Sequence, residues 1–86
     1  MNVLLPSPLY SYTGGQREVQ ARGATLEALL DDLDRQYPGL RFRIIDEQGA
    51  VRPHLRFFVN RDMVRSLDHR LEMQDEVLIV AALSGG

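Results

Sequence analysis

The sequence predicts an α+β fold in which one main helix packs on one face of a mixed sheet of four or five strands. Three observations lead to this prediction. The chain has 86 residues, enough for one domain with one modest core. One segment carries a single apolar stripe of helical period, and several short segments around it alternate between apolar and polar residues. A helix with one stripe needs one face of a sheet to cover it.

The N-terminal part predicts a β-hairpin with a long, irregular loop. Residues 2–5 are rich in strand formers, and Pro6 and Pro8 then remove two backbone donors, so that this strand ends, bulges or lies on an edge. Thr13-Gly14-Gly15 is typical of a turn, and residues 16–22 alternate around Val19 and Ala21 as a second strand.

The main helix is the clearest element. Its apolar stripe follows the spacing i, i+3, i+4, i+7 and i+11, at Leu26, Leu29, Leu30, Leu33 and Tyr37. Thr25 stands where an N-cap belongs, Glu27 complements the helix dipole, and Pro38-Gly39 ends the helix. Asp31, Asp32 and Asp34 fan out over the opposite side, which we interpret as a solvated face and not as a metal site.

The second half of the chain predicts further strands and turns. Leu40, Phe42 and Ile44 alternate with Arg41 and Arg43, as in a half-buried strand, and Asp46-Glu47-Gln48-Gly49 forms a turn. Residues 55–59 place Leu55, Phe57 and Val59 on one face and Arg56 and Phe58 on the other. The remaining segments are a tight turn at Asn60-Arg61-Asp62, a short return strand at 63–67, a connecting turn at 71–75 and a final strand at 76–81.

In the final strand, Val77, Ile79 and Ala81 face inward, and Leu78 and Val80 face outward. If the first and last strands pair at the centre of the sheet, they run parallel. The resulting architecture is a β-grasp (ubiquitin-like) roll over residues 1–82, followed by a small flexible tail over residues 83–86.

Composition excludes several function classes. The net charge of −2 provides no general attraction to nucleic acid or to anionic membranes, and no apolar run has the length of a membrane span. The N-terminus shows no leader, so we expect a cytoplasmic protein that is monomeric when free. The chain has no Cys, and therefore no thiol that could hold sulfur or attack as a nucleophile. It also has no Lys, and all ten basic residues are Arg.

No independent active site emerges from the motifs. His54 and His69 stand alone, without the spacing that a metal site needs, and the serines have no evident base. We therefore expect no bound metal or cofactor and no catalytic activity of the chain itself.

The tail is the candidate working group. Gly85 and Gly86 lack a Cβ atom, which suits a carboxylate that enters a narrow enzyme channel. An α-carboxylate is an unreactive anion at neutral pH, so it needs activation, for instance by adenylation with ATP. Sulfide from a donor persulfide then displaces AMP and leaves a thiocarboxylate on Gly86. The sequence leaves open whether Gly86 is encoded as the terminus or exposed by proteolysis.

Several segments, in this order and spacing, resemble the MoaD/ThiS family of small sulfur carriers. They are Thr25-Leu26, Tyr37-Pro38-Gly39-Leu40, Arg52-Pro53-His54, Phe58-Val59-Asn60, Asp75-Glu76-Val77 with Ile79, and Gly85-Gly86. Residues 12–16, Tyr-Thr-Gly-Gly-Gln, are similar to the CysO-like branch, which serves cysteine synthesis and thiolated metabolites. The family usually has Gly where Arg61 and Gln74 stand here, so the geometry of two turns is in question.

The resemblance implies two kinds of partner. One is an adenylating and sulfurylating enzyme of the ubiquitin-activating type, which uses ATP; the other is a sulfur-accepting synthase, either PLP-dependent or the large subunit of molybdopterin synthase. We expect the docking surface on the outer face of the sheet and the tail, at Phe58, Leu78, Val80, Arg41, Arg43, Arg56, Leu83 and Ser84.

The leading hypothesis is a sulfur carrier for cysteine or a thiolated metabolite or cofactor. The alternative within this class is a small subunit of molybdopterin synthase. From other classes, a protein modifier conjugated through Gly86 and a plain interaction module remain open.

Overall fold

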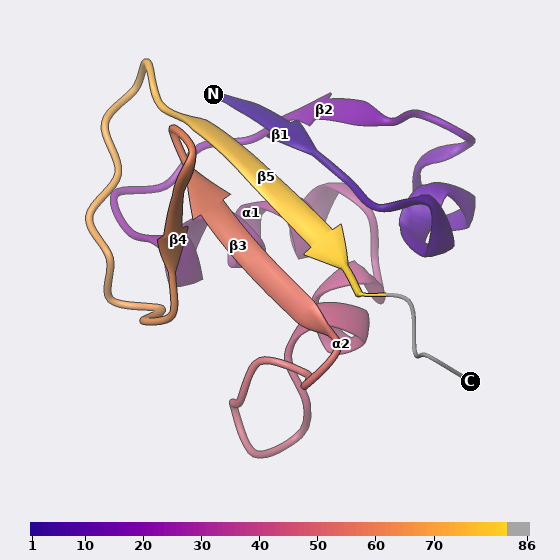
Figure 1. The fold of residues 1–86 in the computed structure, drawn as a ribbon. Coiled ribbons are helices and arrows are strands. Elements are labelled where there is room, and N and C mark those ends of the chain that lie inside the picture. Colours follow the sequence, from indigo (N-terminus) through magenta and orange to yellow (C-terminus); the bar gives the residue numbers. More distant parts are fainter. Residues whose placement is uncertain (83–86) are drawn as a thin grey trace.

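The computed structural model describes residues 1–82 and shows one sheet with its α-helices behind it (Figure 1). The elements in chain order are β1 (Asn2–Leu4), the 3₁₀ helix η1 (Ser7–Thr13), β2 (Glu18–Gln20), α1 (Leu26–Gln36), α2 (Leu40–Ile44), β3 (Leu55–Val59), β4 (Asp62–Val64) and β5 (Glu76–Ala81).

The sheet has the order β2-β1-β5-β3-β4 within the described residues. The first and last strands lie side by side and run parallel, with Val3 opposite Val77, whereas the other neighbouring pairs are antiparallel. This mixed sheet with α1 on one face confirms the predicted β-grasp fold.

The core lies between α1 and the inner face of the sheet. Leu26, Leu29, Leu30 and Leu33 of the predicted stripe are fully buried. They belong to the same apolar cluster as Val3, Phe57, Val77 and Ile79, which are also almost completely buried. Each such side chain contributes about 1.5–3 kcal/mol when it leaves water, so this layer dominates the stability of the fold.

Both ends of α1 follow the predicted signals. Thr25 Oγ1 accepts the N–H of Ala28 at 3.2 Å, as an N-cap does. At the other end Tyr37 donates its N–H to the Leu33 carbonyl, and Gly39 adopts a φ of +95°. This conformation is sterically unfavourable for a residue with a Cβ atom, so glycine at position 39 allows the chain to turn sharply.

The prediction of a strand at 40–44 is wrong, because these residues form α2. Leu40 and Ile44 are buried, but Phe42 is 53% exposed. Over five residues, an i, i+4 pair and a strand alternation both place residues 40 and 44 on one face, so the period alone could not decide. The Asp34 carboxylate favours the helix by accepting the N–H groups of Gly39 and Arg41, each at 3.1 Å.

The hairpin between β3 and β4 has the tight turn that the sequence predicts. Asn60 and Arg61 adopt positive φ values of 49° and 79°. The Asn60 amide anchors the turn, since its Nδ2 donates to Asp75 Oδ1 at 2.7 Å and its Oδ1 accepts the Glu76 N–H at 3.0 Å. The return strand is shorter than predicted and ends at Val64 instead of residue 67.

The N-terminal hairpin forms as predicted, but its loop contains η1, which the sequence analysis did not predict. Strand β1 ends at Leu4, before the two prolines. Thr13 is buried, and its hydroxyl lies within hydrogen-bond distance of the Tyr10 and Gln16 carbonyls. Gly14, at a φ of +66°, then leads the chain toward β2.

Candidate functional site

The candidate tail departs from the centre of the sheet. Strand β5 lies between β1 and β3, and the Ala82 N–H donates to the His54 carbonyl at 2.7 Å just beyond its end. The base of the tail is therefore held on the side of β3 up to Ala82. Leu83, Ser84, Gly85 and Gly86 lie outside the described residues, so their predicted roles remain predictions.

An apolar row crosses the outer face of the sheet. Leu4 on β1 pairs with Leu78 on β5, Leu78 pairs with Phe58 on β3, and Phe58 pairs with Met63 on β4. Leu78 is 38% exposed and Met63 is 48% exposed. Residues directly opposite each other on neighbouring strands have Cβ atoms only about 4.5–5.5 Å apart. These four therefore lie side by side in one band, which we call the apolar row.

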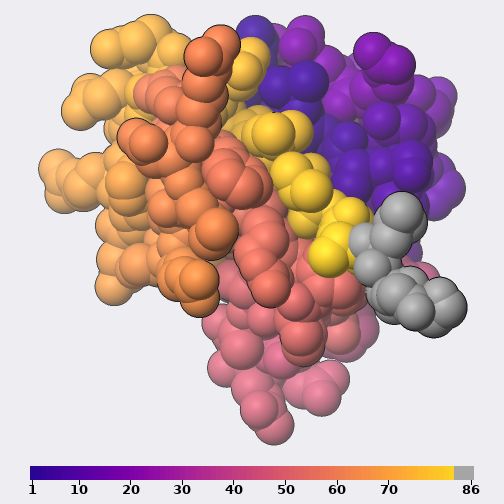
Figure 2. All heavy atoms as spheres, viewed as in Figure 1, coloured from indigo at the N-terminus to yellow at the C-terminus, as the bar shows by residue number. Residues whose placement is uncertain are grey.

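The apolar row lies on the side of the molecule seen in Figure 2, where β5 runs between β1 and β3. Phe58, Leu78 and Val80 project from this face, as predicted from the alternation. The sequence analysis missed Leu4 and Met63. The expected parallel pairing of the first and last strands could have identified Leu4, because it places Leu4 beside Leu78 on the outer face.

A shallow hollow adjoins the base of the tail. Its volume is about 510 Å³, and its wall includes Pro6, Pro8, His54, Val80 and Ala82. The hollow continues the apolar row, because Leu78 also lines it. A partner that holds the tail can therefore contact an apolar surface immediately beside it.

Arg56 also belongs to β3 and stands opposite Val80. The prediction that it shares a face of the sheet with Phe58, Leu78 and Val80 is therefore confirmed. The Arg56 guanidinium turns back toward its own strand, and Nη1 donates to the carbonyls of Pro53 at 2.7 Å and Leu55 at 2.8 Å. The head group of Arg56 is thus held at the beginning of β3.

The prediction that Arg41 and Arg43 share the outer face is wrong, because both lie on α2. Arg41 pairs with Glu27 at 3.2 Å, and its Nε lies 2.9 Å from Asp31 Oδ1 although the N–H does not point at that oxygen. Arg43 donates from Nε to the Tyr12 hydroxyl. Both arginines therefore stabilise the junction of α2 with its neighbours, and the short helix carries them away from the sheet surface.

The interpretation of the aspartates as a solvated face is wrong for Asp32, which is only 7% exposed. Burial by itself would raise the pKa of Asp32, but the Arg22 N–H, the Gln36 amide and the Arg35 guanidinium together hold that pKa below its ordinary value. Asp32 therefore joins α1 to the segment that follows β2.

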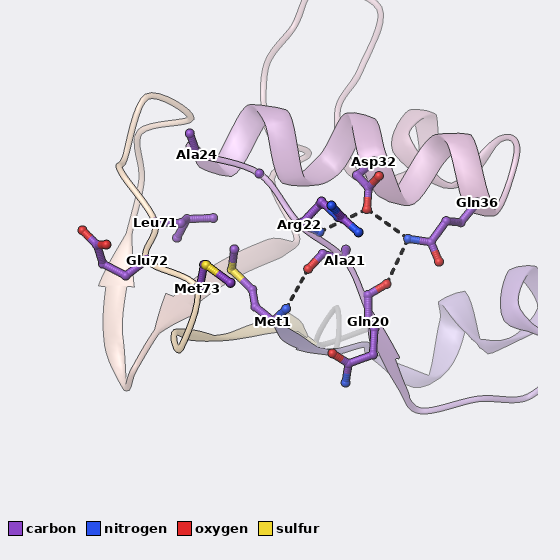
Figure 3. Close-up of a pocket in the computed structure, with 11 residues that line it drawn as sticks. Met1, Gln20, Ala21, Arg22, Ala24, Asp32, Gln36, Leu71, Glu72 and Met73 are labelled. Atoms are coloured by element: carbon purple, nitrogen blue, oxygen red, sulfur yellow. Dashed lines mark hydrogen bonds between the residues drawn. The ribbon is translucent and has the colours of Figure 1, made fainter.

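A larger hollow lies at the other end of β5, between α1 and residues 71–73 (Figure 3). Its volume is about 940 Å³. The polar groups in its wall bind one another: the Met1 ammonium donates to Ala21, and Gln36 bridges Asp32 and the Gln20 carbonyl. This hollow is a structural junction about 20 Å, the length of β5, from the base of the tail.

Within residues 1–82, no three His, Asp or Glu side chains gather as a metal site would require. No helix of that part is long and apolar enough to cross a membrane. The described residues form a β-grasp body with an apolar outer face, and in the sequence Gly85-Gly86 follows shortly after its last strand. This combination is the organisation of ubiquitin-like carrier proteins.

The family model of the ThiS family matches residues 3–86. The chain is also 34% identical to the sulfur carrier protein CysO of Mycobacterium tuberculosis, over 100% of this chain and 98% of that protein. This chain therefore belongs to the ThiS family and is a homologue of sulfur carrier proteins, as the resemblance predicted.

Solved structures agree with this assignment. The chain resembles the structure of an Amycolatopsis orientalis BexX/CysO complex with a TM-score of 0.91 and 30% identity, covering 99% of this chain and 98% of the other. It resembles M. tuberculosis CysO with a TM-score of 0.90 and 33% identity, covering 95% and 98%. For SAMP1 from Haloferax volcanii the TM-score is 0.80 at 27% identity, covering 100% and 98%. The resemblance to CysO does not favour the alternatives of a molybdopterin synthase subunit, a modifier or a plain interaction module.

Proposed function

We propose that this protein is a sulfur carrier of the CysO type, and that the carboxylate of Gly86 in its working form carries the sulfur. The observation that supports this best is the position of Gly85-Gly86, four residues beyond a central strand, at the end of the match to a family that includes sulfur carriers. The absence of Cys from the sequence leaves the chain no thiol for this task.

The chemistry needs two steps on the partner enzyme. The Gly86 carboxylate attacks the α-phosphorus of ATP, forms an acyl adenylate and releases pyrophosphate. A thiol attacks a donor persulfide, forms a disulfide with it and releases sulfide. The sulfide then attacks the acyl carbon and displaces AMP, so that sulfur replaces one oxygen. The first step is necessary because a free α-carboxyl group, with a pKa of about 3.3–3.7, is an unreactive anion at neutral pH.

In this proposal the chain acts as a co-substrate, and the catalytic groups belong to its partners. The first partner is an adenylating enzyme of the ubiquitin-activating type, which also binds the ATP. The second is a biosynthetic synthase, PLP-dependent as suits cysteine formation, that accepts the sulfur. The carrier itself holds no cofactor, and both encounters take place in the cytoplasm.

The apolar row gives these partners a surface to recognise. Leu78 lies on β5, which leads to the tail, and Phe58 lies opposite it on the neighbouring β3. The hollow beside Pro6 and Pro8 extends this surface toward Ala82. Apolar patches with polar rims are typical of docking sites. An enzyme that binds this face therefore has the tail within reach of its active site.

The test is the intact mass of the protein after incubation with the adenylating enzyme, ATP and a sulfide source. We expect the mass to rise by the difference between one sulfur and one oxygen atom. A variant that lacks Gly86 is the control and should gain nothing. If the wild-type chain gains no mass with an enzyme that loads a known carrier, the proposal is wrong.

A second measurement, on cell extracts, separates the carrier from a modifier. A modifier forms isopeptide bonds with lysines of other proteins, so cell extracts would show conjugates of high mass that disappear when Gly86 is deleted. We expect free thiocarboxylated protein and no such conjugates.

A further inference from the structure

A groove lined by three arginines lies where β3 and β4 separate. We call it the arginine groove, and its volume is about 360 Å³. Its wall includes Val51, Arg52, Leu55, Arg56, Val64 and Arg65. Leu55 and Val64 are buried and form an apolar floor, whereas Arg56 and Arg65 are exposed.

No carboxylate lines this groove. The sequence from residue 48 to residue 61 contains three arginines and no Asp or Glu, although the whole chain has a net charge of −2. The N–H groups of Ala50 and Gln48 lower the pKa of the Asp46 carboxyl and occupy its Oδ1, and the Arg52 guanidinium helps to lower this pKa. Among residues 1–82, the ion pairs involve Arg35 and Arg41 only. The groove therefore concentrates positive charge that no ion pair within residues 1–82 neutralises.

Two of the three guanidinium groups are held in place. Arg52 donates from Nε to the Phe42 carbonyl at 2.8 Å and stacks over the Phe42 ring at 4.8 Å from its centroid. Arg56 donates through Nη1 to Pro53 and Leu55. A guanidinium has five N–H donors, so these bonds leave several donors for another ligand. Because these side chains are already ordered, they lose less conformational entropy when a ligand binds.

The groove adjoins the base of the tail. Strand β4 pairs with β3 only from Phe57 to Val59, so the beginning of β3 has no strand on that side. On its other side, Leu55 pairs with Ala81 at the end of β5. The groove and the departing tail are therefore separated by one strand, since neighbouring strands lie about 4.8 Å apart.

We propose that the arginine groove receives an acidic segment of the partner protein that holds the tail. Carboxylates pair with guanidinium groups in a fork geometry, and the floor of Leu55 and Val64 accommodates an apolar side chain between two acidic ones. A bare phosphate would match the charges but leave this floor uncovered. The identity of the partner as the Gly86-activating enzyme rests on the proposed function, whereas the affinity of the groove for acidic segments does not.

The direct test is a titration of the ¹⁵N-labelled full chain with a synthetic peptide of alternating Glu and Leu, followed by NMR. A peptide with Gln in place of Glu and inorganic phosphate are the comparison ligands. We expect saturable shifts at residues 51–56 and 64–65, weaker binding at higher salt, and no comparable effect of the Gln peptide. Shifts scattered over arginines elsewhere, or the same shifts with phosphate at equal concentration, would overturn the docking proposal.

Arg65→Glu tests the charge, because within residues 1–82 the Arg65 side chain makes no hydrogen bond that the substitution would break. We expect it to weaken peptide binding about tenfold and to raise the KM of the activating enzyme for this carrier about tenfold, with kcat unchanged. Arg70→Glu, an equal charge change at an exposed position outside the groove, is the matched control. Equal effects of the two variants would overturn the proposal.

The peptide titration does not involve Gly86. A failed mass gain would therefore contradict the carrier function and the assignment of the activating enzyme as partner, but not the groove. An absence of peptide binding would contradict the groove and leave the carrier function intact.

Discussion

Gly23 lies against the backbone of helix α1, so that a Cβ atom on it would be 2.4 Å from the Leu29 nitrogen. The atoms it would meet are backbone atoms, which cannot move aside without displacing the helix. The φ of Gly23 is not among the positive values of this chain, so the close approach, and not a left-handed conformation, requires glycine here.

Gly23→Ala should therefore lower the free energy of unfolding by at least about 2 kcal/mol, measured by urea denaturation. Gly49→Ala is the matched control. It places a Cβ in open space at a φ of +83°, and we expect it to cost only about 1 kcal/mol. If the two variants lose the same stability, the contact with Leu29 is looser than the structure shows.

Arg61 is an exposed residue with a φ of +79° in the turn between β3 and β4. Glycine adopts this conformation without steric cost, although it loses more backbone entropy on folding than arginine does. We expect the steric relief to outweigh the entropy loss, so that Arg61→Gly stabilises the protein by about 0.5–1 kcal/mol. Arg61→Ala keeps the Cβ and should change the stability by less than about 0.5 kcal/mol. Thermal unfolding measures both, and an equal gain in the alanine variant would show that the arginine side chain, and not the backbone, is the cause.

Asp32 should make the stability depend on pH in the acid range. Its pKa is below the ordinary value of 3.8, so its contribution is present above that pH and is lost as the pH falls through the lowered pKa. Asp32→Asn should cost about 1–2 kcal/mol at neutral pH and reduce the loss of stability below about pH 4.

Asp31→Asn is the control for Asp32, because the Asp31 side chain is 64% exposed and its loss should cost less than about 0.5 kcal/mol. Some acid sensitivity should persist in Asp32→Asn. The Glu72 N–H and the Asn60 amide lower the pKa of Asp75 in the same direction. Identical stability-versus-pH curves for Asp32→Asn and the wild type would contradict the role of Asp32.

Leu78 is the member of the apolar row closest to the centre of the sheet. Leu78→Thr keeps a side chain that suits a strand but removes most of the apolar contact. We expect it to weaken binding of the activating enzyme about tenfold, measured as KM in the thiocarboxylation assay, with normal unfolding. Met73→Thr, at an 88% exposed position away from the row, should leave KM unchanged; an equal effect would show that the outer face is not the docking surface.

Long or strongly patterned segments were predictable from the sequence. The leucine stripe defined α1 together with its Thr25 cap, and the alternation at 76–81 predicted the bounds of β5 and the burial of Val77 and Ile79. The segment at 40–44 was not predictable, because five residues do not distinguish the two periods and the deciding contacts come from Asp34. The burial of Asp32 was also not predictable from the sequence, because its hydrogen bond to the Arg22 N–H joins α1 to the segment after β2.

The sequence by itself determined the α+β class, the Gly85-Gly86 tail and the absence of any thiol, because these depend on local pattern and composition. Only the tertiary structure decided which side chains meet. The apolar row needs the register of four strands, with Leu4 and Met63 joining Leu78 and Phe58. The arginine groove needs Arg65 to return beside Arg52 and Arg56. Register and proximity between distant segments arise from the packing of the whole core, and no local pattern specifies them.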